Sequence, residues 1–494
     1  MRFLPHAAAF VAGAAAVLGF SPVDFFPASL AALVLLIHLW MRAASPSAAL
    51  RIGFFFGLGL YGAGASWVYV SLNRFGGMPM PLAAVATLAW CAFLALFPAL
   101  AGWIQARVAR DSAAPPALQA TLLIPAVWTL IEWPLSWFLT GFPWLALGYT
   151  AIDDPLSGFA PLGGVYAVSL AMAVAAGLLW CVVLGNMRHT RWIAGGALAI
   201  MLACGYALRA IEWTAPVGEP LRVALLQGNV PQEMKFDPAR YERMLEVYAR
   251  LAEDSDARLI VLPETAVPRF LDLVDPAYIE RLKAAAVRNG GDLLLGVPVR
   301  NSAGNYLNSV ISMGVSPPAS YDKSHLVPFG EFVPPGFGWI VRVLSIPLAD
   351  FSRGATDQRP MAVAGQRVAV NVCYEDAYGA ELIRQLPEAT LLVNVSNVAW
   401  FGDSLAPAQH LQIARMRALE TGRVYLTAAN TGITAAIWPD GSVRQQMPQF
   451  SRGLIQFEVR GYSGATPYVR FGDWPAVLTA LLALAFVALR GRSR

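Results

Sequence analysis

A chain of 494 residues, of which 56% are apolar and only 14% charged, is too apolar for an ordinary soluble enzyme, because soluble domains average about 25% charged residues. The formal net charge is +4 and the arginines are scattered along the sequence, which excludes the concentrated basic patch of a nucleic-acid-binding protein. The length is sufficient for two or three domains.

Seven apolar segments are expected to cross a membrane before residue 212, and an eighth closes the chain. They lie near residues 5–20, 26–41, 52–71, 81–104, 118–137, 160–185, 192–209 and 474–489. Most have the length of about 20 residues that a membrane-spanning helix needs. The first two are shorter and could form a tilted or partly re-entrant hairpin. The first also resembles a signal peptide, but further spans follow at once and no clean cleavage site precedes Pro22, so we expect it to be retained.

The distribution of arginines predicts the orientation of these segments. With the N-terminus inside, ten arginines face the cytoplasm: Arg2, Arg42, Arg51, Arg107, Arg110, Arg188, Arg191, Arg490, Arg492 and Arg494. The opposite loops hold only Arg74, with Asp153 and Asp154. This bias predicts a bacterial inner membrane protein with both termini in the cytoplasm. Residues 1–211 would form transmembrane helices 1–7, residues 212–473 a periplasmic catalytic domain, and residues 474–494 the eighth helix and a cytoplasmic tail.

Residues 212–473 alternate short apolar runs with amphipathic stretches, which is the pattern of an α/β domain with buried sheets. The predicted strands are residues 222–227, 258–262, 292–299, 307–313, 367–373, 389–395, 424–429, 434–438 and 453–459. The predicted helices are residues 238–253, 277–288 and 407–421.

Residues 332–352 interrupt this pattern with an apolar run that contains prolines, glycines and Trp339. The run could be a packed surface loop or a membrane-facing lid. Because long loops without regular structure are more often functional than accidental, we favour the lid.

Three strands in this region are each followed by a reactive side chain, Glu264, Lys323 or Cys373. The ends of strands are where α/β folds present such groups to a cleft. Taken singly, each residue also has a structural interpretation, as a solvated carboxylate, a surface cation or a buried core cysteine. The other three cysteines lie in apolar segments, so Cys373 has no disulfide partner in the polar region. The five histidines are widely dispersed and show no metal-ligand spacing.

Taken together and in this order, the three residues resemble the Glu-Lys-Cys triad of the nitrilase (carbon–nitrogen hydrolase) superfamily. Further motifs extend the resemblance to the apolipoprotein N-acyltransferase family over nearly the whole chain. They are residues 141–144, 227–232, 329–334, 373–375, 394–397, 400–402, 415, 420, 430–432 and 470–475. One departure is Phe236, where the family often has Trp; an aromatic face is kept but the indole N–H is lost.

The resemblance implies an αββα sandwich fused to an eight-helix transmembrane bundle. The reaction it implies moves an acyl chain from a phospholipid to the N-terminal α-amine of a diacylglyceryl-cysteine in an apolipoprotein. The partners are then the phospholipid donor, the diacylated acceptor and the membrane, with no nucleic acid, and nothing in the sequence indicates an oligomer, so we expect a monomer. No cofactor or metal is required by this chemistry.

The chemistry of the three side chains agrees with that reaction. Cys373 would be the nucleophile and carry the acyl chain as a thioester. Glu264 would be the general base, and we expect burial to raise its pKa toward neutrality. Lys323 would stabilise the tetrahedral oxyanion, with the backbone N–H of Tyr374 as a second donor.

Several further residues are candidates for supporting roles. The resemblance implies that Glu331 and Glu375 order the lysine and the cleft, although either could be a structural carboxylate in an ion pair. Tyr374 and Trp400 could line the acyl path or belong to the core. The remaining substrate or lid candidates are Phe236, Trp339 and Trp144, the last of which would fit a belt of aromatic residues at the membrane interface.

Two other functions remain open. A membrane-tethered amidase or nitrilase would use the same triad on a small amide, but it gives no reason for eight spans. A non-catalytic membrane scaffold or transporter would leave the triad idle. Transport pathways usually contain ionisable groups, and Glu132 is the main one within the spans.

Overall fold

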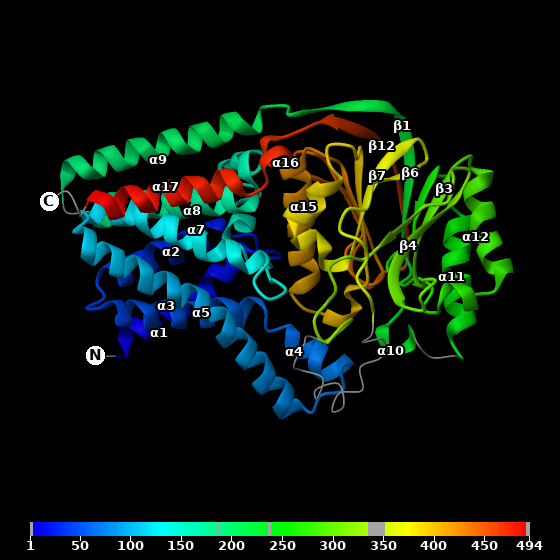
Figure 1. Cartoon of the computed structure of the whole chain (residues 1–494), viewed down its shortest axis with the longest axis horizontal. Helices are drawn as coiled ribbons and strands as arrows, with labels where there is room; N and C mark the ends of the chain where they lie inside the picture. The colour runs from blue at the N-terminus through cyan, green and yellow to red at the C-terminus, as the bar shows by residue number, and fades with distance from the viewer. Residues whose placement is uncertain (1–2, 186, 236–238, 334–350, 491–494) are drawn as a thin grey trace. The chain divides into compact units, whose positions relative to one another are not determined.

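The structure, a computed structural model, describes residues 3–185, 187–235, 239–333 and 351–490. The chain divides into two compact units, which are described separately here. The first comprises Met1–Tyr69, Met80–Glu212 and Thr466–Arg494, and the second comprises Val70–Pro79 and Trp213–Ala465. Figure 1 labels their helices and strands.

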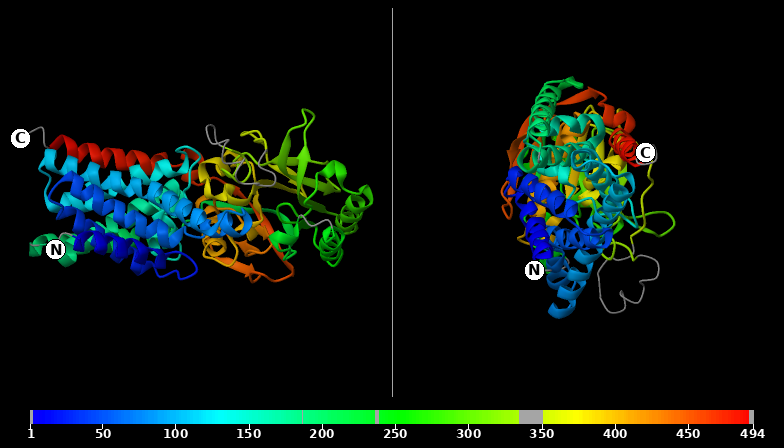
Figure 2. Two further views of the ribbon diagram at one scale, coloured as in Figure 1. Left: turned by 90° about the horizontal axis from the view of Figure 1, so that it is seen from below. Right: turned by 90° about the vertical axis from the view of Figure 1, so that its left-hand side faces the viewer.

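The first unit is a bundle of apolar helices that lie side by side (Figure 2). Its main helices are α1 (Leu4–Ala16), α2 (Phe26–Met41), α3 (Pro46–Gly64), α5 (Met80–Ser112), α7 (Ile124–Glu132), α8 (Ala160–Leu184), α9 (Arg188–Arg209) and α17 (Trp474–Arg490). Glycines let the backbones approach closely, as membrane helices commonly do. A Cβ added to Gly53 of α3 would lie 2.2 Å from the carbonyl oxygen of Pro98 in α5.

Each of the eight predicted apolar segments coincides with helical structure among the described residues. Four helical stretches are long and apolar enough to cross a membrane: Met80–Ser112, Pro116–Ser136, Pro155–Leu184 and Arg188–Arg209. A fifth would combine Pro46–Gly64 with Val68–Phe75, which are bent by 57°. Leu4–Gly19, Phe26–Met41 and Trp474–Arg490 are shorter apolar helices. Within the predicted segment 52–71 the helix is interrupted, because α3 ends at Gly64 and Val70–Pro79 belongs to the second unit.

The second unit contains two six-stranded sheets. The first has the strand order β12 (Gly453–Gly464), β1 (Thr214–Gln227), β2 (Leu259–Val261), β3 (Asp292–Arg300), β4 (Tyr306–Gly314) and β5 (Ser320–Asp322). The second has the order β11 (Val443–Gln446), β10 (Ala435–Ile437), β9 (Tyr425–Ala429), β8 (Leu391–Ser396), β7 (Gln366–Val372) and β6 (Met361–Val363). The central strands β1–β2–β3 and β7–β8–β9 pair in parallel.

Helices cover the outer faces of both sheets, which confirms the expected αββα sandwich (Figure 1). Helices α11 (Tyr241–Glu253) and α12 (Pro276–Arg288) pack on the first sheet, and α15 (Ala406–Thr421) packs on the second. Strands β2, β8 and β9 are buried at every position, because each lies under a helix on one face and the other sheet on the opposite face.

All nine predicted strands occur, with altered ends. The first begins earlier than predicted, at Thr214, and the strand before the thiol ends at Val372 rather than at Cys373. The sequence patterns missed β5, β6 and β11, which have only three or four residues. Of the predicted lid, the structure describes residues 332–333 and 351–352, and Trp339 lies outside the described residues.

Candidate active site

Cys373 lies in a sharp turn directly after the buried strand β7. It is the first residue of a short 3-10 helix, Cys373–Ala377, and its φ is +57°. This left-handed conformation costs a residue with a side chain about 1–2 kcal/mol, so contacts must hold it in place. The carbonyl oxygen of Cys373 accepts a hydrogen bond of 2.8 Å from Nδ2 of Asn394 in the neighbouring strand β8.

Glu264 follows β2 and is 6% exposed. Its Oε1 accepts a hydrogen bond of 2.8 Å from Nδ2 of Asn308 and lies 3.5 Å from Nζ of Lys323. Its Oε2 accepts a hydrogen bond of 2.8 Å from the backbone N–H of Asn397, just beyond β8. The backbone carbonyl of Glu264 accepts from Nζ of Lys235 at 3.2 Å. The carboxylate is thus held by donors from both sheets.

Lys323 is 1% exposed and lies between two carboxylates. Its Nζ is 2.9 Å from Glu331, whose other contacts are Nδ2 of Asn308 and the backbone N–H of Val327, both at 2.8 Å. Asn308 therefore bridges Glu264 and Glu331, and Glu331 orients the lysine. Nζ of Lys323 also lies 5.6 Å from the centre of the Tyr374 ring.

The charges of these groups determine one another. Burial raises the pKa of Cys373, the Glu264 carboxylate raises it further, and Lys323 opposes both, so the resting side chain is a thiol. Burial lowers the pKa of Lys323, but Glu331 and Glu264 raise it by more, so the ammonium stays charged.

The expected upward shift of the Glu264 pKa is wrong. Burial, the largest single influence, does raise this pKa. The positive charge of Lys323, the hydrogen bond from Asn308, the charge of Lys235 and the N–H of Asn397 together outweigh burial and lower it. Glu264 is therefore an ionised carboxylate, which is the form that can accept a proton.

Glu375 joins the segment after Lys323 to the strand before Cys373. Its Oε1 accepts hydrogen bonds from the backbone N–H and Oγ of Ser324 and from the N–H of His325, at 2.8–3.0 Å. Its Oε2 accepts from the N–H of Val372 at 2.7 Å and from the hydroxyl of Tyr321 at 3.1 Å.

Three of these partners, the backbone N–H groups of Ser324, His325 and Val372, can only donate, and they favour the ionised form of Glu375. Burial raises the pKa of Glu375 from its ordinary value, while the N–H donors and Lys323 oppose this shift. Both oxygens of the carboxyl group accept from at least one backbone N–H, so neither oxygen is free of an obligatory donor.

The variant Glu375→Gln is expected to lower the free energy of unfolding by about 3 kcal/mol, since hydrogen bonds to buried charged groups are worth about 1.5–3 kcal/mol and an amide NH2 would face donors. The measurement is the thermal unfolding midpoint in detergent. Glu388→Gln is the control, because Glu388 is 39% exposed in its ion pair with Arg367 and should cost less than about 1 kcal/mol. Equal midpoints for the two variants would contradict the assigned role of Glu375.

The aromatic candidates occupy different surroundings. The hydroxyl of Tyr374 donates to the carbonyl of Leu326 at 2.7 Å, and its side chain is nearly buried. The carbonyl of Trp400 accepts from Oγ of Ser71 at 2.8 Å, and its ring meets the ring of Phe75 edge-on at 6.0 Å. The residues 70–79 therefore pack on the turn that follows β8.

Trp144 belongs to the first unit, where its ring lies 5.2 Å from Trp67 and 6.3 Å from Phe142. It is only 2% exposed, so it is not part of an exposed interfacial belt, contrary to expectation. Phe236 lies outside the described residues.

The sequence interpretation missed three residues that contact the candidate base: Lys235, Asn308 and Asn397. Asn308 could have been recognised as a polar residue inside an otherwise buried strand, since such residues need partners. Lys235 is 2% exposed, and burial lowers its pKa to about 7 against the opposing charges of Glu264 and Cys373. Only its burial, which the sequence does not show, distinguishes it from a surface lysine.

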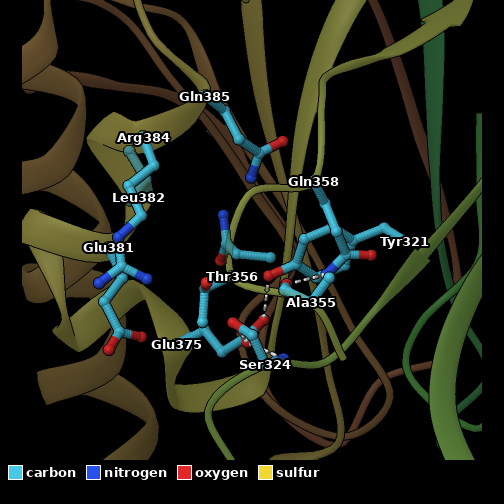
Figure 3. Close-up of a pocket in the computed structure, with 11 residues that line it drawn as sticks. Tyr321, Ser324, Ala355, Thr356, Gln358, Glu375, Glu381, Leu382, Arg384 and Gln385 are labelled. Carbon is cyan, nitrogen blue, oxygen red and sulfur yellow. Dashed lines mark hydrogen bonds between the residues drawn. The ribbon is translucent and has the colours of Figure 1, made fainter. Parts of the chain in front are cut away.

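A polar pocket lies on the far side of Glu375 (Figure 3). It is lined by Tyr321, Ser324, Ala355, Thr356, Gln358, Asn371, Glu375, Glu381, Leu382, Arg384 and Gln385. None of Glu264, Lys323 and Cys373 lines it, so we do not assign it to the reacting acyl group.

A buried thiol, a carboxylate and an ammonium that act on one another can perform nucleophilic acyl chemistry. The carboxylate can take the thiol proton, the thiolate can attack a carbonyl carbon, and the ammonium can stabilise the oxyanion. Among the described residues, no group of three or more His, Cys, Asp or Glu is arranged to hold a metal ion.

Two family models match the chain. The model described as apolipoprotein N-acyltransferase N-terminal domain matches residues 12–178, and the carbon-nitrogen hydrolase model matches residues 222–468. The chain is 49% identical over 486 residues to a protein of Nitrosomonas europaea named apolipoprotein N-acyltransferase, covering 97% of this chain and 96% of that protein. A protein of Ralstonia nicotianae with the same name is 43% identical, with coverage of 100% and 94%.

Two solved structures show a more distant similarity. The NitFhit protein of C. elegans has 18% sequence identity and a TM-score of 0.39, covering 51% of this chain and 62% of that one. A carbon-nitrogen hydrolase from Helicobacter pylori G27 has 17% identity and a TM-score of 0.38, covering 53% and 95%. Similarity this low carries no argument about activity.

Proposed function

The chain belongs to the apolipoprotein N-acyltransferase family, and from that premise we propose that it transfers an acyl chain from a membrane phospholipid to the N-terminal α-amine of a diacylated apolipoprotein through a thioester on Cys373. The observation that carries the mechanism is the buried cluster in which Glu264, Lys323 and Cys373 act on one another. Membership of the family supports the acyl transfer, and the cluster of three side chains supports a thioester on Cys373 as the intermediate.

In the first half-reaction, Glu264 accepts the proton of the Cys373 thiol as the sulfur attacks the ester carbonyl of the phospholipid. The oxyanion of the tetrahedral intermediate faces the ammonium of Lys323, with the N–H of Tyr374 as a further donor. When the intermediate collapses, the C–O bond breaks and protonated Glu264 gives its proton to the departing lysophospholipid. The acyl chain is left on sulfur as a thioester.

In the second half-reaction, the neutral α-amine of the acceptor attacks the thioester and gives a proton to Glu264. The C–S bond breaks, the amide leaves, and the Cys373 thiolate recovers its proton from Glu264. Lys323 again stabilises the oxyanion and does not itself transfer a proton, because its neighbouring carboxylates raise its pKa. The two substrates react in turn, which is a ping-pong order.

The bundle of apolar helices supports a membrane location, which is where a phospholipid donor is found. The arginine distribution supports residues 212–473 in the periplasm and both termini in the cytoplasm. A small-amide hydrolase would use the same triad, but the family membership favours the lipoprotein acyltransferase.

Purified protein supplied with a phospholipid that carries a labelled acyl chain, and with a synthetic diacylglyceryl-cysteine peptide, is expected to add one labelled acyl group to the peptide. The measurement is the peptide mass, and the control is the same peptide with an acetylated N-terminus, which should gain nothing. Release of labelled fatty acid without peptide acylation would instead favour a hydrolase, and an absence of any reaction would favour a non-catalytic scaffold.

A further inference from the structure

A buried ion pair that the reaction steps above do not use lies behind the nucleophile. Asp376 is in the same turn as Cys373 and is 0% exposed, and His410 projects from α15 and is 6% exposed. Nε2 of His410 lies 2.9–3.0 Å from the two carboxylate oxygens of Asp376. Burying two charged groups costs free energy, so we looked for a role that the pair could have in the site.

The same ring nitrogen also reaches the nucleophile. Nε2 of His410 lies 3.3 Å from the carbonyl oxygen of Cys373, which accepts its other hydrogen bond from Asn394. His410 therefore holds both Cys373 and Asp376, which are three residues apart in one turn. This turn contains the left-handed backbone of Cys373, and strained conformations of this kind persist only when surrounding contacts enforce them.

The surroundings of His410 favour its protonated, positively charged form. Burial lowers the pKa of His410, but the charge of Asp376, the hydrogen bond to Asp376, the Cys373 carbonyl and the charge of Glu264 raise it by more, so that it lies above its ordinary value of 6.5. Among charged side chains, Asp376, beside the ring, and Glu264 thus both favour the protonated form of His410. The protonated ring carries an Nε2–H that faces both acceptors, and its positive charge strengthens both hydrogen bonds.

We propose that Asp376 and His410 are a positioning pair that holds the Cys373 turn in the conformation from which the thiol reacts. The hydrogen bond from His410 links the carbonyl of Cys373 to α15, and the carboxylate of Asp376 accepts from the same Nε2–H and so keeps this nitrogen a donor. The proposal rests on the proposed thioester chemistry, because it concerns how fast Cys373 becomes acylated. Neither residue touches the substrate.

Helix α15 offers a matched control for this pair. Arg417 and Glu420 form a second ion pair at 3.0 Å, with side chains 1% and 0% exposed. Both residues belong to α15, and they are buried as deeply as Asp376 and His410. Glu420→Gln therefore removes a charge from a comparable pair outside the Cys373 turn.

The test measures the rate of thioester formation by intact mass, with labelled phospholipid and no acceptor. Asp376→Asn is expected to slow acylation by about 10²-fold, which is the typical effect of misplacing a reacting group by about 1 Å. The effect should fall on kcat, with KM for the phospholipid unchanged. Glu420→Gln should lower the thermal midpoint but slow acylation far less.

The pH dependence of the acylation rate distinguishes a positioning role of the pair from a purely stabilising role. The hydrogen bond from His410 is charge-assisted, and therefore stronger, only while the ring is protonated, so the rate should fall as the pH rises through the pKa of His410. Without the charge of Asp376, burial dominates and the pKa of His410 falls, so this decline should move to lower pH in Asp376→Asn. If the pair only stabilised the fold, Asp376→Asn would leave the pH of this decline unchanged.

The double variant Asp376→Leu/His410→Leu keeps the test valid if the single variant folds poorly. Apolar replacement of a whole buried ion pair is often neutral or stabilising, so the thermal midpoint should recover, while acylation should remain slow because the Cys373 carbonyl has lost its donor. A stable double variant that acylates at the wild-type rate, or a Glu420→Gln variant as slow as Asp376→Asn, would overturn the proposal. Wild-type protein that forms no thioester would instead overturn the proposed function itself.

Discussion

Protein incubated with a labelled phospholipid and no acceptor is expected to gain the mass of one acyl group, and the Cys373→Ala variant is expected to gain none. Alanine cannot form the thioester, so the rate of transfer to an acceptor should fall by at least about 10⁴-fold, as it does when nucleophiles are removed from related mechanisms. The adduct should be released by hydroxylamine, which cleaves thioesters.

Cys204→Ala is the control for this result, because Cys204 is an exposed cysteine of the first unit. It should acquire the adduct at the wild-type rate. An adduct that persists in Cys373→Ala, or that peptide mapping places on Cys204, would show that Cys373 is not the nucleophile.

The second large effect is expected from Glu264→Gln, which should slow both half-reactions by about 10²–10⁴-fold. The amide has nearly the shape of the carboxylate but cannot accept the proton of the thiol or of the amine. Single-turnover acylation and deacylation, measured separately by intact mass, would show the effect in both steps. Glu280→Gln on the surface of α12 is the control, since Glu280 is 70% exposed and should leave both rates unchanged.

The lowered pKa of Glu264 adds a pH signature to this prediction. The carboxylate remains ionised down to below its ordinary pKa of 4.5, so the wild-type acylation rate should show no loss due to Glu264 between pH 8 and pH 5. By linkage, the stability that the ionised group contributes is present above that ordinary pKa and is lost as the pH falls through the lower folded value. An acid limb near pH 6 to 7 that disappears in Glu264→Gln would contradict the lowered pKa.

Local patterns predicted much of the architecture. The Val-rich run before Cys373 and the other short apolar runs identified nine of the twelve strands found among the described residues, and the apolar segments located the helices of the first unit. These features depend on neighbours a few residues away, so a sequence displays them directly. The order of Glu264, Lys323 and Cys373, each after a strand, resembled the triad of the superfamily, and further motifs along the chain extended the resemblance to the family.

The sequence determined which residues are the candidates for the chemistry, and the tertiary structure decided how they are charged and held. Asn308, Asn397 and Lys235 reach Glu264 from segments far apart in the chain, and they lower its pKa where burial alone would raise it. The hold of His410 on the Cys373 turn likewise depends on the packing of α15. A pKa and a strained turn both depend on all the atoms within a few ångströms, and only the folded chain brings those atoms together.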